Sequence, residues 1–407
     1  MTQFKKTSNG WVPIVASCMV VFWPGAFIFG FPGIMAPYWQ ELFQVGRGEV
    51  GRTHFFLLAA VGIFMVVSGR LQEKVKSRNL VLFGTILCGG SMFLPGFAKG
   101  ISIIYLWAFL TGTSASFILI PALTIAQQWL PEKRGLASGL VNMALGVSAA
   151  VVSPPIAHLM NSIGYIKTTQ LLGFCALLTG LVSIPFLRRP SSDFSATTAA
   201  ANLSRSEHPL TLKQILYSRS FWSLWLAWGF AGAAGIATVI LSTTFGLARG
   251  LSMEKAVLIL TAFNMTNGVS RFIAGYLSDV IGRRLTMGIT FVMAGVAYGL
   301  LPHVTGLTAW ITIATVVGFS FGTVFAVSAP LIVDCFGIER FGTIFGMVFT
   351  AYAFVAGPLG PWLSGYILDR TSGDFTLVFY YLATLCFLAA FLVRYVTPPA
   401  LNKREII

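Results

Sequence analysis

The feature that most constrains this chain is a series of apolar segments, each about 20 residues long. Such a segment crosses the roughly 30 Å hydrocarbon core of a bilayer as one α-helix. Lipid offers no hydrogen-bonding partner for backbone groups. A segment of this length that crosses the bilayer outside a closed barrel must therefore be helical. Twelve such segments begin near Trp11, Val50, Leu80, Ile101, Gly135, Thr168, Phe221, Ala256, Thr286, Leu307, Gly342 and Leu377. The sequence therefore predicts an all-α membrane protein with 12 transmembrane helices.

The composition supports a membrane protein and argues against several other classes. Of the 407 residues, 56% are hydrophobic and only 10% are charged, and the mean hydropathy is +0.80. The net charge of +14 is not concentrated in a basic domain, so we expect no nucleic-acid partner. The five cysteines lie in or beside apolar segments, which suits buried small side chains better than disulfides or a metal site.

The sequence also lacks the patterns of common catalytic sites. No Ser/His/acid set, Cys-x-x-Cys, His-Glu-x-x-His or phosphate-binding glycine loop occurs at a useful spacing. We therefore expect neither an enzyme nor a bound cofactor.

Lysine and arginine are distributed unevenly between the loops. With both termini on one side, 19 of the 27 basic residues fall on that side, seven fall on the other, and Arg271 lies inside a segment. Basic loops stay in the cytoplasm, so we predict cytoplasmic termini in a multi-pass protein of the cell inner (plasma) membrane. Residues 1–10 are interpreted as a retained tail, because the apolar run after them is too long for a signal peptide.

The middle of the chain differs in composition from the rest. Residues 188–209 are rich in Ser, Ala and Thr, a composition that cannot bury a core and favours a cytoplasmic linker. Residues 210–216 after it are predicted to form a short amphipathic helix on the membrane surface. We divide the chain into an N-terminal six-helix bundle (1–189), a linker with this helix (190–219) and a C-terminal six-helix bundle (220–407).

The two halves repeat one another at an offset of 206 residues. The pattern Gly-x-x-x-acid-x-x-x-x-Arg follows the second segment as GRLQEKVKSR (69–78) and the eighth as GYLSDVIGRR (275–284). Pro155 and Pro361 share the same offset. An ordinary basic loop after a helix would explain one copy of the pattern, but not its return at the matching place. Parallel repeats of six helices are typical of transporters whose two bundles rock against each other.

The repeated loops suggest a gating role. Their acidic and basic residues can pair between helices on the cytoplasmic side and lock one state of an alternating-access cycle. The residues to which we assign this role are Glu73, Arg78, Asp279, Arg283 and Arg284.

The eighth segment carries an arginine, Arg271, near its middle. Such a charge costs about 2.5–3.5 kcal/mol even on the lenient insertion scale, and guanidinium does not deprotonate in proteins. Its planar fork suits a carboxylate. The helical period places Asn264, Asn267, Gly268 and Gly275 on the same face, which predicts the wall of an anion pathway. Pairing with a buried acid or with backbone carbonyls, or snorkelling to an interface, are the structural alternatives.

The repeated ten-residue loop resembles a signature of the major facilitator superfamily, and 12 segments with a linker after the sixth extend the resemblance over the whole chain. Three further stretches resemble the monocarboxylate transporters and the neighbouring oxalate–formate exchangers. They are NGW (9–11) with GFP (30–32), WLPEKRGLASG (129–139), and DCFGIERFG (334–342) with GPLG (357–360).

This resemblance implies the major facilitator fold and a transporter of lactate-like monocarboxylates that are commonly moved with a proton. Arg271 matches the arginine that holds the substrate carboxylate in this family. The sequence departs from the family at Gly33, where animal members carry lysine, and at Asn267, where they carry aspartate. It also has Thr350 where some members carry glutamate. The usual titratable partners of the arginine are therefore absent, and the sequence names no proton carrier.

We expect a secondary active transporter of short-chain monocarboxylates, L-lactate above all, that works by proton symport with alternating access. Arg271 is expected to bind the carboxylate and Asn267 to orient it or the 2-hydroxyl. Phe325 and Tyr352 are predicted to enclose the apolar end of the substrate, although packing alone would also explain them. Anion exchange and a non-transporting membrane sensor of organic acids are the alternatives. The expected partners are a monocarboxylate anion, a proton and the lipid bilayer, and no accessory subunit is required.

Overall fold

The structure is a computed structural model, and it describes residues 2–72, 74–130, 134–188, 190, 211–337 and 341–397. Within these ranges, 12 helical stretches are long and apolar enough to cross a membrane, which confirms the predicted number. The stretches are Gly10–Phe43, Arg47–Leu71, Ser77–Phe97, Ile101–Trp129, Leu136–Ile163, Tyr165–Phe186, Arg219–Ala248, Met253–Ile281, Arg283–His303, Leu307–Phe336, Thr343–Arg370 and Phe375–Val393.

The first six spans contain the elements α1 to η3. They are α1 (Thr2–Phe29) and α2 (Phe31–Phe43), which form the first span together, α3 (Arg47–Leu71), α4 (Ser77–Ser91) with η1 (Pro95–Phe97), α5 (Ile101–Trp129), α6 (Arg134–Ile163), and α7 (Tyr165–Ser183) with η3 (Ile184–Phe186).

The second six spans follow a short helix, α9 (Leu212–Leu216). They are α10 (Arg219–Ala248), α11 (Met253–Ile281), α12 (Arg283–Leu300) with η4 (Leu301–His303), α13 (Leu307–Phe336), a composite span of α14 (Phe341–Ala351), η5 (Tyr352–Ala356), η6 (Pro358–Trp362) and α15 (Leu363–Arg370), and α16 (Phe375–Val393).

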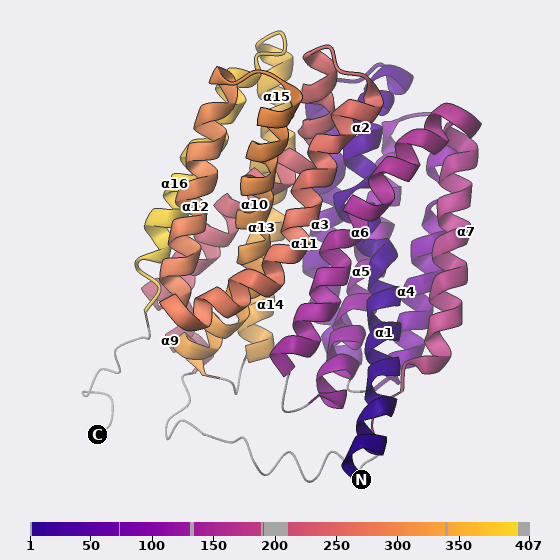
Figure 1. The fold of residues 1–407 in the computed structure, drawn as a ribbon, viewed down its shortest axis with the longest axis vertical. Helices are drawn as coiled ribbons and strands as arrows, with labels where there is room; N and C mark the ends of the chain where they lie inside the picture. The colour runs from indigo at the N-terminus through magenta and orange to yellow at the C-terminus, as the bar shows by residue number, and fades with distance from the viewer. Residues whose placement is uncertain are drawn as a thin grey trace.

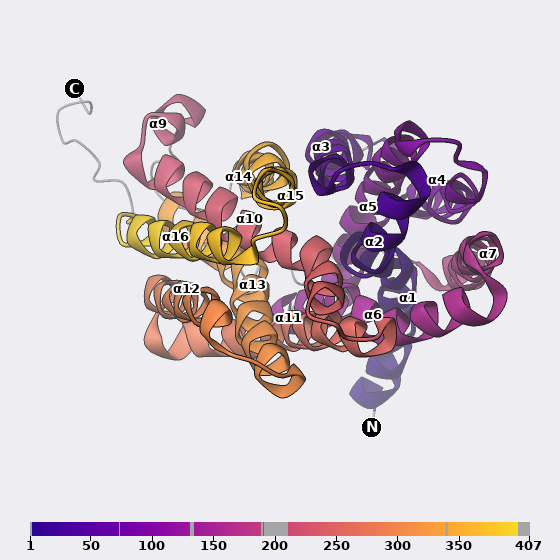
Figure 2. The same ribbon diagram turned by 90° about the horizontal axis from the view of Figure 1, so that it is seen from above.

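The two sets of spans stand side by side as two bundles. Figure 1 shows the long helices running nearly parallel, and Figure 2 shows α1–α7 on one side and α10–α16 on the other. Helix α6 packs against α11, and α3 packs against the span that contains η5, η6 and α15. We call the end at which α1 begins and α9 lies the terminal end, and the opposite end the distal end. The two packed pairs are called the α6–α11 seam and the α3–α15 seam.

The sequence repeat of 206 residues is also a repeat of helix boundaries. In the first half, α3, α4, η1 and α5 begin at Arg47, Ser77, Pro95 and Ile101. In the second half, α11, α12, η4 and α13 begin at Met253, Arg283, Leu301 and Leu307, each 206 residues later. The halves therefore share their helix starts in the second to fourth spans, as a parallel repeat requires.

The outward faces of the bundles remain apolar. Phe83 and Ile86 on α4 and Phe174 on α7 are among the large hydrophobic side chains that stay exposed. A soluble protein would bury such side chains, whereas in a bilayer they contact lipid. Together with the span lengths, these faces show a multi-pass membrane protein.

The short helix predicted after the linker is present as α9. Thr211 caps its N-terminus by accepting a hydrogen bond from the backbone N–H of Gln214, and the Gln214 side chain accepts one from the Thr211 N–H. This reciprocal capping box satisfies two free N–H groups of the first turn. Most of the predicted linker, residues 191–210, lies outside the described part of the chain.

The first span is broken rather than straight. Helix α1 ends at Phe29, α2 begins at Phe31, and Gly30 lies between them. Pro32 has no N–H to donate, so the carbonyl of Ile28, four residues earlier, loses its helical partner. We call residues 28–33 the span-1 hinge.

Candidate functional site

Helix α11 supplies the polar face that the sequence predicts. Asn264 and Asn267 have no exposed surface, and Arg271 is only 3% exposed. Spacings of three and four residues bring these side chains to one stripe of the helix. The stripe faces α6 of the other bundle, because Arg271 bonds the backbone of Asn142 on α6 and Gly268 lies against Gly146 of the same helix. Arg271 is therefore buried between the bundles rather than snorkelling to a membrane interface.

The backbones of α6 and α11 are in direct contact because each helix has a glycine where the two cross. A Cβ added to Gly146 of α6 would lie 2.7 Å from the Cα of Gly268 on α11. A Cβ added to Gly268 would lie 2.6 Å from the backbone nitrogen of Val147. Any larger residue would separate the helices, as in other membrane helix pairs with small residues at the contact. The sequence placed Gly268 on the polar face, and the structure shows that it fits the opposite backbone.

The guanidinium of Arg271 is held by two neutral oxygen atoms. Its Nη1 donates to the backbone carbonyl of Asn142 on α6 at 3.1 Å, and its Nη2 donates to Oδ1 of Asn267 at 3.3 Å. Among the described residues, the only salt bridges lie at Arg283, so no carboxylate neutralises Arg271. One of the alternatives, pairing with a backbone carbonyl, is thus realised in part, and the charge itself stays uncompensated.

Several polar atoms around this charge have no partner within the described ranges. They are Nε of Arg271, Nδ2 of Asn267, Oη of Tyr352 and Oδ1 of Asn264. Three of the four can donate a hydrogen bond. Buried polar atoms without a partner are rare in folded proteins, and free donors beside a fixed positive charge are groups that an acceptor with negative charge would satisfy.

Aromatic rings cover one side of the guanidinium. Its central carbon lies 4.4 Å from the ring centre of Phe325 and 5.8 Å from that of Phe29. Tyr352 packs on Phe325 at 5.6 Å between ring centres, and Phe321 lies between Phe29 and Phe325. The structure therefore brings both predicted aromatics, Phe325 and Tyr352, to the arginine. Phe29 and Phe321 join them from α1 and α13.

The eleventh span is irregular where it passes the site. Tyr352 opens the π-helical segment η5, and a second π-helical segment, η6, contains Pro358 and Pro361. Such bulges are rare and frequently occur at functional sites. Thr350, at the position of the glutamate in some family members, accepts a hydrogen bond from Nε1 of Trp225 at 3.0 Å. That position serves packing between spans in this chain.

At the distal end, the α3–α15 seam is tightly closed. The carboxylate of Asp369 accepts hydrogen bonds from the backbone N–H groups of Arg47 at 2.9 Å and Gly48 at 2.8 Å. Farther along the seam, a Cβ on Gly51 would lie 2.3 Å from the carbonyl oxygen of Pro361. The acid of one bundle thus caps the first helix turn of the other.

A second distal contact explains one departure from the family. A Cβ at Gly33 would lie 2.0 Å from the carbonyl oxygen of Val239 on α10. A lysine at this position would not fit, because the two backbones already touch. A glycine at position 33 is therefore what this close contact between the bundles requires.

Toward the terminal end, the same seams are looser. A Cβ at Gly139 of α6, at Gly275 of α11 or at Gly69 of α3 would meet no atom within 4 Å. Gly275 was placed on the polar face with Gly268, but it lies beyond the helix crossing. The closest backbone contacts between the bundles thus lie in the distal half, and these three glycines of the terminal half take part in none.

The predicted gating residues have mixed outcomes. Arg283 binds the carboxylates of Asp279 at 2.9 Å and Asp334 at 2.6 Å, which links α11, α12 and α13 within the second bundle. Arg78 and Arg284 are exposed, and Glu73 lies outside the described residues. The structure therefore shows pairing between helices at the terminal end of the second bundle. A gating role for the five residues stays a prediction.

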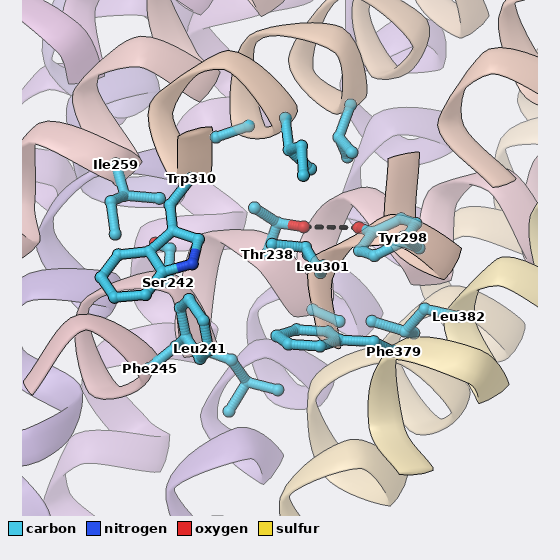
Figure 3. Close-up of a pocket in the computed structure, with 14 residues that line it drawn as sticks. Thr238, Leu241, Ser242, Phe245, Ile259, Tyr298, Leu301, Trp310, Phe379 and Leu382 are labelled. Carbon is cyan, nitrogen blue, oxygen red and sulfur yellow. Dashed lines mark hydrogen bonds between the residues drawn. The ribbon is translucent and has the colours of Figure 1, made fainter. Parts of the chain in front are cut away.

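A separate cavity lies in the distal half of the second bundle, away from Arg271 (Figure 3). Its volume of about 40 Å³ holds only a few water molecules. The walls are mostly apolar, and the hydroxyls of Thr238 and Tyr298 are hydrogen-bonded to each other. Neither Arg271 nor Asn267 lines this cavity, so it is distinct from the candidate site.

Sequence reasoning missed two polar residues of this region. Asn142 on α6 contributes the carbonyl that binds Arg271, and His54 on α3 is fully buried beside the span-1 hinge. A histidine and an amide inside apolar segments are the same kind of signal that identified Asn267. A search for polar residues inside apolar segments could have found both residues, but it could not have shown which atoms they contact.

Comparison with known proteins concerns the family and the fold. The family model described as Major Facilitator Superfamily matches residues 18–259 and 235–406. The monocarboxylate transporter 2 of Meriones unguiculatus is 27% identical over 385 residues, which cover 89% of this chain and 78% of that protein. The human protein of the same name is 26% identical over 391 residues, with 89% and 80% covered. The oxalate:formate antiporter of Oxalobacter formigenes is 25% identical over 336 residues, with 81% and 78% covered.

Among solved structures, a bacterial homolog of the human lysosomal transporter Spinster, in an inward-facing and occupied conformation, superposes with a TM-score of 0.70. The match covers 94% of this chain and 93% of that chain at 14% sequence identity. The same homolog in an unoccupied conformation gives a TM-score of 0.67. At such low identity the likeness concerns the fold alone.

Proposed function

The chain belongs to the Major Facilitator Superfamily, and we propose that it is a secondary transporter of short-chain monocarboxylates, with L-lactate as the first candidate and a proton as the co-transported ion. The two bundles would rock about the α6–α11 and α3–α15 seams and expose Arg271 to each side in turn. Membership of this family and the names of the relatives favour a transporter over a non-transporting sensor.

The observation that carries this proposal is the buried, uncompensated charge of Arg271. A carboxylate would accept hydrogen bonds from its Nε, from Nδ2 of Asn267 and from Oη of Tyr352, the free donors of the site. Hydrogen bonds that involve charged groups are worth about 1.5–3 kcal/mol each. One carboxylate would neutralise the site, whereas a dicarboxylate would leave it with net negative charge in a medium of low dielectric constant. A monoanion is therefore favoured.

The remaining polar and apolar groups suit a small 2-hydroxy acid. Oδ1 of Asn264 is a free acceptor that a substrate hydroxyl could satisfy. Phe325 and Phe29 offer apolar surface beside the guanidinium. The charged group, the hydroxyl acceptor and the apolar surface would thus match the carboxylate, the 2-hydroxyl and the methyl group of lactate.

The orientation belongs to the same proposal. Because the loops at the terminal end hold most of the basic residues, that end would face the cytoplasm. The protein would lie in the plasma membrane with both termini inside. The ion pairs of Arg283 with Asp279 and Asp334 would then brace the second bundle at its cytoplasmic end.

The first test is uptake of labelled L-lactate into proteoliposomes with an imposed, inside-alkaline pH gradient. Arg271→Gln should lower the initial uptake rate about 100-fold or more, since it removes the charge and two donors. Arg271→Lys should retain part of the activity with a raised KM, because an ammonium cannot bind both carboxylate oxygens in a fork. Arg394→Gln, an exposed arginine at the end of α16, is the matched control and should transport normally. Normal uptake by Arg271→Gln would overturn the proposal.

Anion exchange is the second candidate, and one observation favours it. Within the described ranges, no titratable acid lies beside Arg271, and one relative is named an antiporter. Preloading the vesicles with unlabelled lactate and omitting the pH gradient separates the two. Uptake that needs the preloaded anion and ignores the gradient would establish exchange instead of symport.

A further inference from the structure

His54 is a fully buried histidine at the span-1 hinge. Its Nε2 lies 3.0 Å from the carbonyl oxygen of Ile28, the carbonyl that Pro32 deprives of its helical partner. A carbonyl can only accept a hydrogen bond, so Nε2 must carry the proton of the neutral ring. The other nitrogen, Nδ1, is then the unprotonated one.

Nδ1 of His54 has no hydrogen-bond partner within the described part of the chain, and it is shielded from solvent. It is therefore a free proton-accepting site inside the membrane-spanning core. Within the described residues, His54 makes no hydrogen bond or ion pair with a charged or titratable side chain. The groups of this kind on α3 and on the elements packed against it are Arg47, Glu49, Arg52 and Arg70 on α3, Tyr38 and Glu41 on α2, Tyr105 on α5, Tyr352 on η5, and Tyr366, Asp369 and Arg370 on α15. Helix α10 carries its arginines, Arg219 and Arg249, at its two ends.

The hinge connects His54 to the Arg271 site. The next carbonyl along the chain, that of Phe29, accepts a hydrogen bond from Nδ2 of Asn264 at 3.0 Å. The ring of Phe29 lies against the guanidinium of Arg271. Two consecutive hinge carbonyls are thus bound by a histidine of the first bundle and by the polar face of α11 in the second.

Other groups are poor candidates for a proton that moves with the substrate. Arginine stays protonated in proteins, and a tyrosine gives up its proton only at about pH 10. The acids of the described spans, such as Asp279, Asp334 and Asp369, lie at helix ends. A histidine is the side chain whose ordinary titration range falls near neutral pH.

We propose that His54 is the proton carrier of the transport cycle and that it binds the proton at Nδ1, an inference that rests on the proposed symport of a monocarboxylate. The proton arrives from the distal side when the distal contacts open. The imidazole gains one proton and one positive charge, and Nε2 continues to donate to the Ile28 carbonyl. The proton leaves to water on the terminal side after the carboxylate departs from Arg271.

Electrostatics couple the two events. Without substrate, a protonated His54 would add a second positive charge to a core that already holds Arg271, which is unfavourable at low dielectric constant. A bound carboxylate removes this repulsion, so the anion strengthens proton binding, and by linkage the proton strengthens anion binding to the same extent. Protonation also makes the bond to Ile28 charge-assisted and stronger, which stiffens the hinge when both ligands are bound.

The test uses His54→Gln, which can keep a donor to the Ile28 carbonyl but cannot be protonated. Wild type and variant are reconstituted and compared in gradient-driven accumulation of labelled L-lactate and in lactate/lactate exchange without a gradient. We expect the variant to lose accumulation at least tenfold and to keep exchange within about twofold. His158→Gln, the same change at an exposed histidine, should behave as wild type in both assays.

The outcomes separate this inference from the function on which it rests. Gradient-driven accumulation by His54→Gln would overturn the role of His54 and leave the transporter intact. Exchange by the wild type without any response to the gradient would also overturn it. If the wild type neither accumulates nor exchanges lactate, the proposed function itself fails.

A second measurement covers the case in which His54→Gln does not fold. The chain has four histidines, and changing His158, His208 and His303 to glutamine leaves His54 as the only one. Nitrogen-15 NMR of this protein should show Nδ1 becoming protonated at a pH higher by at least half a unit when lactate is added. A ring that stays neutral with lactate across pH 5–8 would overturn the inference.

Discussion

At the scale of the residue, the site is defined by what Arg271 lacks. Its guanidinium binds a backbone carbonyl and the Asn267 amide, and Asn267 stands where the resemblance to the monocarboxylate transporters implies an aspartate. Removing one partner from a buried ion pair costs about 3–5 kcal/mol, because it leaves a charge uncompensated. Under the proposed function, a substrate anion would compensate this charge, and the free energy that the uncompensated charge costs the empty protein would be recovered on binding.

This argument predicts the effect of restoring the carboxylate. Asn267→Asp should raise the stability of the substrate-free protein by about 1–3 kcal/mol and reduce the stabilisation by L-lactate at neutral pH, because the guanidinium is already paired. Thermal unfolding in detergent, with and without lactate, measures both effects. The control is Asn264→Asp on the same face, which should destabilise the protein since it loses the donor to Phe29. An unchanged lactate response in Asn267→Asp would contradict the argument.

At the scale of the element, the N-terminus of α3 is capped by a residue of the other bundle. Helices leave their first N–H groups without partners, and no side chain of α3 caps its start at Gly46. Asp369 of α15 supplies the acceptors instead, and its negative charge lies at the positive end of the helix dipole. The cap holds only while the distal seam is closed, so it contributes to the balance between conformations rather than to the helix alone.

Asp369→Asn should therefore favour opening of the distal seam. N-caps contribute about 0.5–2 kcal/mol, so the open population should rise several-fold. Ser364 is fully buried on α15, and Ser364→Cys in a protein without its native cysteines reports opening through its alkylation rate from the distal side. Asp374→Asn is the control, because Asp374 caps α16 within its own bundle. Equal alkylation rates with and without Asp369→Asn would refute the role of this cap.

At the scale of the whole molecule, two seams decide how the bundles sit. The α6–α11 seam is closed by Gly146 and Gly268, backbone against backbone, and opens beyond Gly139 and Gly275. Where the helices of a seam are in close contact in only one half, the two bundles can rotate about that contact without separating a core that runs along the whole seam. This asymmetry is what alternating access through rocking bundles requires.

Two glycines on α11 provide a matched comparison. Gly268→Ala should destabilise the protein by about 1–3 kcal/mol and abolish most uptake, because its Cβ would lie 2.6 Å from the nitrogen of Val147. Gly275→Ala meets open space and should stabilise the helix by about 0.5–1 kcal/mol. Thermal unfolding and lactate uptake measure the difference. If both variants behave alike, the close approach of α6 and α11 is not what positions Arg271.

The sequence by itself determined the properties that arise within one segment or from a comparison of segments. Span number follows from local hydropathy, the repeat follows from the loops 69–78 and 275–284, and the shared face of Asn267 and Arg271 follows from the helical period. The short helix α9 was also predicted from its own segment. Its cap, Thr211 three residues before Gln214, was not predicted, although that pattern is equally local.

Only the tertiary structure decided which atoms of different helices meet. The carbonyl of Asn142 reaches Arg271 from α6, Asp369 caps α3 from α15, and His54 binds the carbonyl that Pro32 sets free. These partners are separated by up to 322 residues. Their contacts depend on backbone approach at glycines such as Gly268, and a pattern confined to one segment carries no information about the distance to another helix.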